Sequence, residues 1–298
     1  MISTPSLYIV NPVAGKGRSL RIWREVEARL KARGQPVESR ITPGPDTVAG
    51  IAEEAVRRGY RTVIAVGGDG TVREVAGAIA GTKVRFGIIP SGTGNDFART
   101  LDLPRDLDDL INVVTGDETT PADLGQMNGR CFVNIAGVGV DTEIVEEVNR
   151  SPVVISGTIT YLVSAVRTVL RYEPPEMIIR VDGTEICGRV LVLAIANGRY
   201  YGGGIKMAPD ARVNDGLFHV IVAREIGRWE ALRLLPLTYS GRHVHHGKCF
   251  TYTGAEVTVE ADRPLAVQAD GTVVGTLPMA FRVVPHALNV LTRSSLGR

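Results

Sequence analysis

Three glycine-rich loops constrain the fold of this chain more than any other feature of its sequence. Each loop follows a short apolar run and precedes a stretch in which apolar residues recur every three or four positions. The runs that predict strands are residues 7–10, 37–41, 62–66 and 86–89, and those that predict helices are residues 20–32, 47–58 and 72–80. Such alternation is typical of a parallel sheet with helices on both faces. We therefore predict an N-terminal three-layer α/β/α domain that binds its ligand at the carboxyl ends of its strands.

The middle loop, residues 66–74, reads VGGDGTVRE and carries the most specific signal. Gly67, Gly68 and Gly70 permit backbone angles closed to other residues and let phosphate oxygens approach the main chain. The N-terminus of the following helix then directs N–H groups at the anion. Asp69 supplies a carboxylate where Mg²⁺ or a proton would need one. The alternative interpretation is a tight turn with a helix-capping Asp or Thr.

The first loop, residues 9–19, reads IVNPVAGKGRS and offers a phosphate cradle with two basic side chains. Asn11 ends a predicted strand, Pro12 fixes the turn, and Gly15 opens a loop that bears Lys16 and Arg18. A Walker A loop requires Ser or Thr directly after its Gly-Lys pair, which this loop lacks. Taken alone, the segment is also compatible with an ordinary polar turn.

The third loop, residues 88–98, reads IIPSGTGNDFA. Ser91, Thr93 and Asn95 bring hydroxyl and amide groups, and Gly92 and Gly94 bring close backbone approach. Asp96 is predicted to cap a helix that starts at Phe97. Because three such loops follow strands of one sheet, we predict a nucleotide-phosphate site.

Composition excludes several classes of protein. The 298 residues carry 34 basic and 32 acidic side chains, a net charge of +2, which argues against nucleic acid as the main partner. Three scattered cysteines predict neither a disulfide framework nor a zinc site. The N-terminus lacks a secretion signal, and the longest charge-free apolar run, residues 151–166, is shorter than the roughly 20 residues of a spanning helix. A cytoplasmic protein without a transmembrane segment is expected.

From residue 124 onward the sequence becomes rich in predicted strands. They are residues 131–136, 177–181, 190–196, 217–222, 255–260, 265–269 and 280–284. Their spacing predicts an all-β, sandwich-like domain, with two helices at residues 159–170 and 229–239. The predicted domains are residues 1–123, which residues 286–298 would rejoin, and residues 124–285.

The motifs together resemble those of the bacterial diacylglycerol kinase-like lipid kinases, a group that includes sphingosine and ceramide kinases. They are NPVAGKG, GGDGTVRE, PSGTGNDFA, the Asp-Leu-Gly at residues 123–125, the NxxGxGxD pattern at residues 134–141, and GGGIKMAPDARVNDGLF at residues 202–218. The resemblance covers nearly the whole chain. NAD kinases share GGDG but lack PSGTGND, so an NAD kinase-like phosphotransferase is a weaker alternative.

The resemblance implies an ATP-dependent transfer of the γ-phosphate to the hydroxyl of a lipid such as diacylglycerol, as part of phospholipid biosynthesis. It implies that Asp69 and Asp123 hold a catalytic Mg²⁺. A structural Mg²⁺ is implied at Arg212, Asp215 and Leu217, partly through main-chain oxygens, where the alternative interpretation is a hairpin turn. The implied nucleotide-binding residues are Asn11, Pro12, Gly15, Thr42, Gly67, Gly68, Gly70, Thr71, Glu74, Ser91, Gly92, Thr93, Gly94, Asn95 and Asp96.

One position departs from the family pattern. The family reads Asp-Gly-Glu near its C-terminus, where the Glu resembles a general base, but residues 268–275 here read QADGTVVG. Thr272 occupies the position of the Glu and cannot act as a base near neutral pH. Asp69 or Asp270 could substitute, so the predicted catalytic residues are Asp69, Asp123, Asp270 and Thr272. A nucleotide- or lipid-binding pseudokinase with a regulatory role remains the alternative from a different class.

Two further segments have competing interpretations. His243, His245 and His246 lie on a presumed strand that would place them on both of its faces, which favours packing or solvation over a metal site. The apolar helix at residues 229–239 is more typical of a core element than of a membrane anchor. We expect transient peripheral contact with the membrane that holds the lipid substrate, and homodimerisation is left open.

Overall fold

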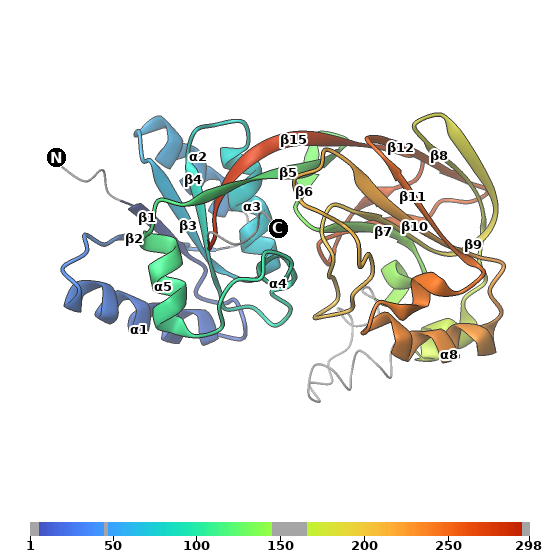
Figure 1. Cartoon of the computed structure of the whole chain (residues 1–298), viewed down its shortest axis with the longest axis horizontal. Helices are drawn as coiled ribbons and strands as arrows, with labels where there is room; N and C mark the ends of the chain where they lie inside the picture. The colour runs from blue at the N-terminus through green and yellow to red at the C-terminus, as the bar shows by residue number, and fades with distance from the viewer. Residues whose placement is uncertain (1–5, 45–46, 145–165, 294–298) are drawn as a thin grey trace. The chain divides into compact units, whose positions relative to one another are not determined.

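The computed structural model describes residues 6–44, 47–144 and 166–293 (Figure 1). The chain divides into two compact units. Unit 1 comprises Met1–Leu124 and Pro285–Arg298, and unit 2 comprises Gly125–Val284. Unit 2 is therefore inserted into the chain of unit 1.

Unit 1 is built on a parallel sheet. Its strands are β1 (Ser6–Val10), β2 (Glu38–Ile41), β3 (Thr62–Gly67), β4 (Arg85–Pro90) and the last part of β15 (Met279–Leu291). They lie in the order β15-β4-β3-β1-β2. β3 is buried along its whole length, as its continuous apolar sequence predicts for a central parallel strand.

Helices cover both faces of this sheet, which confirms the predicted α/β/α domain. They are α1 (Arg18–Ala32), α2 (Val48–Arg57), α3 (Asp69–Ile79), α4 (Asp96–Thr100) and α5 (Leu107–Thr115). α1 buries Trp23, Val26 and Leu30, spaced to lie on one face, against Tyr8 of the sheet and Leu110 of α5. α2 and α3 contact each other and cover the opposite face (Figure 1).

Unit 2 is an antiparallel β-sandwich, as expected from its turn-separated strands. Its strands are the last part of β5 (Thr119–Met127), whose first part belongs to unit 1, β6 (Arg130–Phe132), β7 (Ile135–Gly139), β8 (Glu176–Val181), β9 (Thr184–Ala196), β10 (Phe218–Arg224), β11 (Cys249–Gly254), β12 (Glu256–Ala261), β13 (Ala266–Ala269), β14 (Thr272–Thr276) and the first part of β15. One sheet contains β8, β12 and β15, and the other runs β14-β13-β7-β9-β10-β11. The first half of β9 pairs with β8 and its second half with β7 and β10, so β9 passes from one sheet to the other.

The helix α8 (Arg228–Thr238) and the short 3₁₀ helix η1 (Arg242–His245) lie on unit 2. α8 packs with Leu191 of β9 and Ala223 of β10, which belong to the second sheet. Most of the predicted helix at residues 159–170 lies outside the described residues, of which 166–170 are helical.

Two local predictions were wrong. Residues 131–136 do not form one strand. The N–H groups of Val133 and Asn134 donate to the carboxylate of Asp270, and this break separates β6 from β7 along the chain. The three histidines do not lie on a strand either. His243 and His245 fall in η1, where His243 is buried and its Nε2 lies 3.1 Å from the carbonyl oxygen of Met207.

Candidate active site

The three glycine-rich loops of unit 1 meet at one edge of its sheet. The N–H of Asn11 donates to Val66 O at 3.0 Å, and the N–H of Ser91 donates to Gly67 O at 2.8 Å. The Arg18 guanidinium donates to the carbonyl oxygens of Ser91 and Gly92. Arg18 was predicted to lie in a phosphate cradle, and in the structure it ties the first loop to the third.

Glycine is required where the loops touch. A Cβ on Gly92 would lie 2.5 Å from the Cα of Gly68, so the second and third loops meet backbone against backbone. Gly15 has φ +59°, and a Cβ there would overlap the carbonyl oxygen of Ser91. Any side chain at Gly92 or Gly15 would separate the loops.

Asp69 begins α3 and connects its loop to α4. Its Oδ2 accepts from the N–H of Asn95 at 2.8 Å, and its Oδ1 accepts from those of Asp96 at 2.7 Å and Phe97 at 3.3 Å. These N–H groups belong to the start of α4, where no intrahelical acceptor exists. Desolvation by burial raises the pKa of Asp69 and outweighs the opposing effect of the main-chain hydrogen bonds. The carboxylate is therefore a charge that a nearby cation would stabilise.

This geometry corrects the prediction that Asp96 caps the helix. Asn95 holds the N-cap position with φ +55° and its side chain makes no cap bond to α4. Instead, the Asn95 amide oxygen accepts from Gly92 N–H at 2.8 Å and closes the third loop on itself. The cap of α4 comes from Asp69, which lies 27 positions before Asp96.

The other predicted nucleotide contacts fall in or near these loops. Asn11 Nδ2 donates to the buried Thr71 Oγ1 at 3.0 Å. Thr42 is buried directly after β2, and its N–H donates to Val10 O at 2.9 Å. Thr93 is exposed at the tip of the third loop. The remaining predicted contacts, Pro12, Gly94 in the third loop and Glu74 on α3, are partly buried.

Two observations suit a phosphate ligand at these loops. Gly70 lies in the first turn of α3, and a Cβ added there would meet nothing within 4 Å, so space exists over the helix N-terminus. Ser91 is fully buried, and its Oγ has no hydrogen-bond partner among the described residues. A buried hydroxyl of this kind is unusual in a folded protein and fits a group that awaits a ligand.

Asp123, the second carboxylate predicted to hold the catalytic metal, lies fully buried on β5. Its Oδ1 accepts from the N–H of His286 at 2.7 Å, which fixes it to β15 within unit 1. Across the described ranges, no group of three or more His, Cys, Asp or Glu side chains is placed to hold a metal. A metal at Asp69 and Asp123 would thus need water or phosphate oxygens as further ligands, as Mg²⁺ usually has.

Asp270 and Thr272 lie at the turn between β13 and β14 in unit 2. The carboxylate of Asp270 accepts three main-chain hydrogen bonds, from Val133 at 2.9 Å, Asn134 at 3.0 Å and Ile135 at 3.1 Å. Asp270 thus joins the turn to the start of β7. Thr272 is exposed at the first position of β14.

The predicted structural metal site lies before β10. The Oδ1 of Asp215 accepts from Leu217 N–H at 3.1 Å, and its Oδ2 lies 3.6 Å from His219 Nε2. Arg212 is exposed two residues before Asn214. The turn matches the hairpin interpretation, and a carboxylate with main-chain oxygens is also the donor set that suits Mg²⁺.

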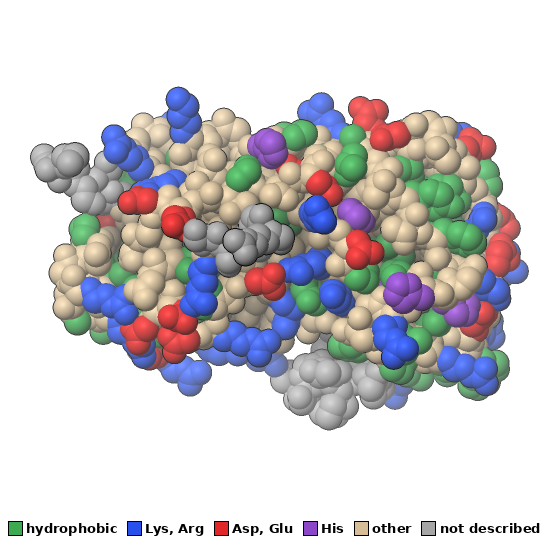
Figure 2. Space-filling view, viewed as in Figure 1, with side chains coloured by type: hydrophobic (Ala, Val, Ile, Leu, Met, Phe, Trp, Pro, Cys, Tyr) green, Lys and Arg blue, Asp and Glu red, His purple; other side chains and the backbone are tan. Residues whose placement is uncertain are grey.

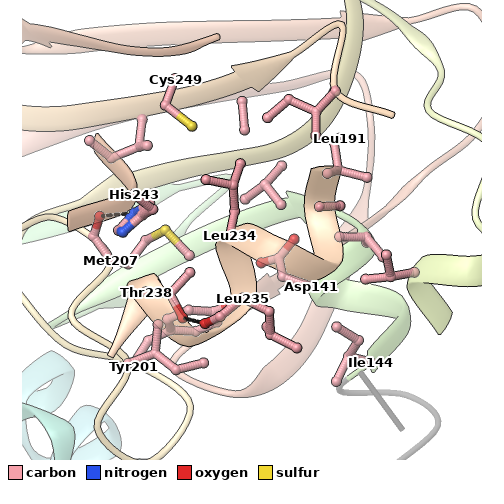
Figure 3. Close-up of a pocket in the computed structure, with 18 residues that line it drawn as sticks. Asp141, Ile144, Leu191, Tyr201, Met207, Leu234, Leu235, Thr238, His243 and Cys249 are labelled. Carbon is pink, nitrogen blue, oxygen red and sulfur yellow. Dashed lines mark hydrogen bonds between the residues drawn. The ribbon is translucent and has the colours of Figure 1, made fainter. Parts of the chain in front are cut away.

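An apolar pocket in unit 2 was not anticipated from the sequence. Its cavity volume is about 80 Å³, and it lies between α8 and the strands β9 and β10 (Figure 3). Leu191, Ile221, Ala231, Leu234 and Leu235 are among its lining residues. A lining that is mostly apolar, with few polar groups, is typical of sites for apolar ligands.

Asp141 is the acidic residue in the wall of this pocket. It is 2% exposed and lines the pocket together with Leu191, Leu234 and Leu235 (Figure 3). Its Oδ2 accepts from Gln268 Nε2 at 3.3 Å, whereas its Oδ1 has no partner among the described residues. Burial raises the pKa of Asp141 to about 6, against the lowering effect of the Gln268 hydrogen bond. Asp141 is the last residue of the NxxGxGxD pattern. Its position directly after an apolar run is the sequence signal that could have identified it as a candidate site residue.

Comparison with known proteins agrees with this geometry. Residues 5–127 match the model of the diacylglycerol kinase catalytic domain, and residues 134–292 match the YegS C-terminal NAD kinase β-sandwich-like domain. A diacylglycerol kinase of Mycobacterium tuberculosis is 33% identical over 95% of this chain and 93% of its own length. The chain belongs to the diacylglycerol kinase family. As a family member, it is a transferase of the kinase class.

Further relatives support the assignment to the diacylglycerol kinase family. The diacylglycerol kinase of Bacillus subtilis strain 168 is 30% identical over 92% of this chain and 91% of its own length. A solved diacylglycerol kinase structure from Bacillus anthracis strain Sterne has a TM-score of 0.75 at 20% identity over 98% of both chains, which supports the fold. None of the described helices of this family member combines the length and the apolar character needed to cross a bilayer.

Proposed function

We propose that this chain transfers the γ-phosphate of ATP, with Mg²⁺, to the hydroxyl of a lipid such as diacylglycerol. The observation that carries the proposal is the buried carboxylate of Asp141 in an apolar pocket, where one of its oxygens has no partner among the described residues. The apolar wall suits a lipid chain, and this oxygen suits a hydroxyl donor. The joined loops of unit 1 supply the phosphate-binding half of the reaction.

On the nucleotide side, the first turn of α3 and the loops around Gly68 and Gly92 would hold the phosphates. Main-chain N–H groups at a helix N-terminus favour negative charge by both hydrogen bonding and the helix dipole. Asp69 and Asp123 would hold Mg²⁺, which when bound neutralises charge on the phosphate oxygens. Asp69 also keeps α4 and the third loop in position through its three main-chain hydrogen bonds.

On the lipid side, Asp141 would orient the acceptor hydroxyl and take its proton. Leaving a buried acceptor unpaired costs about 1–3 kcal/mol, and more for a charged group. A hydroxyl that donates to Oδ1 would remove this cost, which favours lipid binding. Gln268 holds Oδ2, and Gly271 N–H donates to Gln268 Oε1 at 3.1 Å, which fixes the orientation of the amide.

The direct test is transfer of radiolabelled phosphate from ATP to separate acceptors: diacylglycerol, ceramide, sphingosine and NAD. We expect labelled product with a lipid acceptor and none with NAD. Nucleotide binding measured in parallel separates the alternatives, because intact ATP binding without transfer to any lipid would favour a pseudokinase. Transfer to NAD alone would favour the NAD kinase-like alternative.

Thr272→Glu tests whether the missing family base limits the rate. Because Asp141 already serves as the proton acceptor in this proposal, we expect the turnover rate to remain within about threefold of wild type. Thr272 is exposed, so a longer side chain should fit without strain. A rise of about 10²-fold or more, the usual contribution of a general base, would contradict the role of Asp141. Thr272→Gln is the matched control, since it adds similar bulk without a base.

A further inference from the structure

The outer face of α8 carries a cluster of exposed apolar side chains. Trp229 is 74% exposed, Leu237 is 37% exposed and Tyr239, the C-cap residue, is 41% exposed. Seven large hydrophobic side chains are exposed in the part of the chain that the structure describes, and these three belong to one helix and its cap. Isolated apolar residues on a surface are ordinary, but a cluster of them on one helix indicates an interaction surface.

Three side chains on α8 form a continuous row. Trp229, Arg233 and Leu237 are four positions apart, so they lie above one another on the helix surface. Arg228 comes before this row in the chain and Arg242 comes after it, and both are exposed. We call Arg228, Trp229, Arg233, Leu237, Tyr239 and Arg242 the α8 stripe.

The charge of the α8 stripe is positive. Among the described residues, Arg228, Arg233 and Arg242 make no ion pair. The acidic residue of α8, Glu230, is neutralised by Lys248 Nζ at 2.7 Å and lies 3.4 Å from His246 Nε2. Figure 2 shows Lys and Arg side chains among hydrophobic ones over this region, at the lower right of the view.

The opposite face of α8 lines the apolar pocket. Ala231, Leu234, Leu235 and Thr238 contribute to the pocket wall, next to the strands that hold Asp141 in unit 2. A single helix therefore separates the pocket from the α8 stripe. A surface bound by the stripe would lie one helix diameter from the pocket, about 10 Å.

We propose that the α8 stripe docks on an anionic lipid bilayer, with Trp229 and Leu237 in the interfacial layer and the arginines against the head groups. Trp and Tyr favour the membrane interface, and Arg draws the surface toward anionic lipid. The net charge of +2 gives little long-range attraction, so a local cluster of arginines is what such docking needs. The proposal rests on the proposed function, because the bilayer is where a lipid acceptor resides.

Tryptophan fluorescence of the full chain provides the test. The sequence contains two Trp residues, and Trp23 is buried at 2% exposure in unit 1, so Trp229 reports on the stripe. With vesicles of phosphatidylcholine mixed with phosphatidylglycerol, we expect a blue shift of emission and quenching by bromine-labelled acyl chains. Emission that is unchanged by anionic vesicles would overturn the proposal.

Substitutions in the α8 stripe measure the electrostatic contribution to vesicle binding. Arg228→Ser/Arg233→Ser is expected to weaken vesicle partition about 25-fold, because each Arg near an anionic surface contributes about fivefold. Trp229→Ser should weaken partition further and abolish the blue shift. The matched controls are Arg105→Ser and Ile178→Ser, which remove an exposed Arg and an exposed apolar side chain elsewhere and should leave partition unchanged. Equal partition of the stripe variants and the wild type would show that another surface binds.

Activity on two forms of the acceptor separates this proposal from the proposed function. With a short-chain diacylglycerol dispersed as monomers, the stripe variants should keep wild-type activity, whereas with vesicle-embedded diacylglycerol they should lose it in proportion to partition. Equal loss on both substrates would indicate damage to the pocket and contradict docking. If the wild type phosphorylates neither substrate but still partitions through the α8 stripe, the docking proposal stands and the proposed function fails.

Discussion

Asp141→Asn is expected to make the protein more stable at pH 8 while reducing lipid phosphorylation by about 10²-fold or more. The activity falls because the amide cannot take a proton, and a general base usually contributes about 10²- to 10⁴-fold. The stability rises because the substitution removes a buried carboxylate, one oxygen of which has no partner in the part of the chain that the structure describes. Opposite effects on stability and activity are typical of a residue kept for function.

The stability gain should depend on pH in a defined direction. The pKa of Asp141 is raised by burial from 3.8 to about 6, so between these values the folded state binds more protons than the unfolded state. The contribution of Asp141 to wild-type stability therefore falls as pH rises from about 4 to 6 and then levels off, by about 3 kcal/mol at 1.36 kcal/mol per pKa unit. At pH 8 Asp141→Asn should recover about 2 kcal/mol of this, because the amide leaves an unpaired N–H in the pocket.

Denaturant unfolding of both proteins from pH 4 to 8 checks this prediction. The difference in unfolding free energy should be near zero at pH 4 and should grow through pH 6. Asp262→Asn, an exposed carboxylate in the same unit, is the control and should change neither stability nor activity. A variant that is less stable than wild type at pH 8, or that transfers phosphate normally, would show that Asp141 has a structural role only.

Asp69→Ala is expected to abolish phosphate transfer, with a loss of at least about 10³-fold, since a bound metal supplies several kcal/mol of charge stabilisation. The sequence alone predicts that this variant keeps its fold. The structure adds an expected loss of stability, because Asp69 caps α4 from a distance. Loss of a cap typically costs about 1–2 kcal/mol, so we expect a folded but less stable protein.

Asp69→Asn separates the two roles of this side chain. Asn keeps one acceptor oxygen for the N–H groups of α4 but carries no charge for a metal. We expect it to recover part of the lost stability and none of the activity, measured by thermal unfolding and by transfer of labelled phosphate. Asp106→Ala is a matched control, because Asp106 caps α5 through the N–H of Asp109. Normal turnover in Asp69→Ala would rule out both the metal and the catalytic role.

The sequence predicted the parallel core of unit 1 well because each part of its signal is local. Strand, glycine-rich loop and helix follow one another within about 30 residues, and the apolar spacing of each helix is read within a few turns. The β-sandwich was predicted as a class, but β5, β11 and β14 were not identified. Threonine, glycine and charged residues in these strands weaken the alternation on which such predictions depend.

The site could be predicted only in part, because its side chains obtain their partners over long sequence distances. The motif GGDG pointed to Asp69, but nothing in it indicates that the side chain caps α4. Asp141 obtains a side-chain hydrogen bond from Gln268, 127 positions later, and part of its apolar surroundings from the residues of α8. Burial and unpaired oxygens are properties of the folded chain, and no local pattern encodes them. The predicted roles of the nucleotide contacts, of Asp123 and of Asp270 therefore stay predictions.

The path of β15 has a consequence for synthesis of the protein. Its first part pairs with β12 of unit 2, and its last part places Asn289 and Val290 beside Arg85 and Phe86 of β4. Unit 1 therefore lacks a strand of its sheet until residues more than 160 positions beyond Leu124 have left the ribosome. Unit 2, which is continuous in sequence, can fold before unit 1 is complete, against the usual order in which N-terminal domains fold first. A nascent chain paused before β15 would expose the edge of β4, where chaperone binding and aggregation would begin.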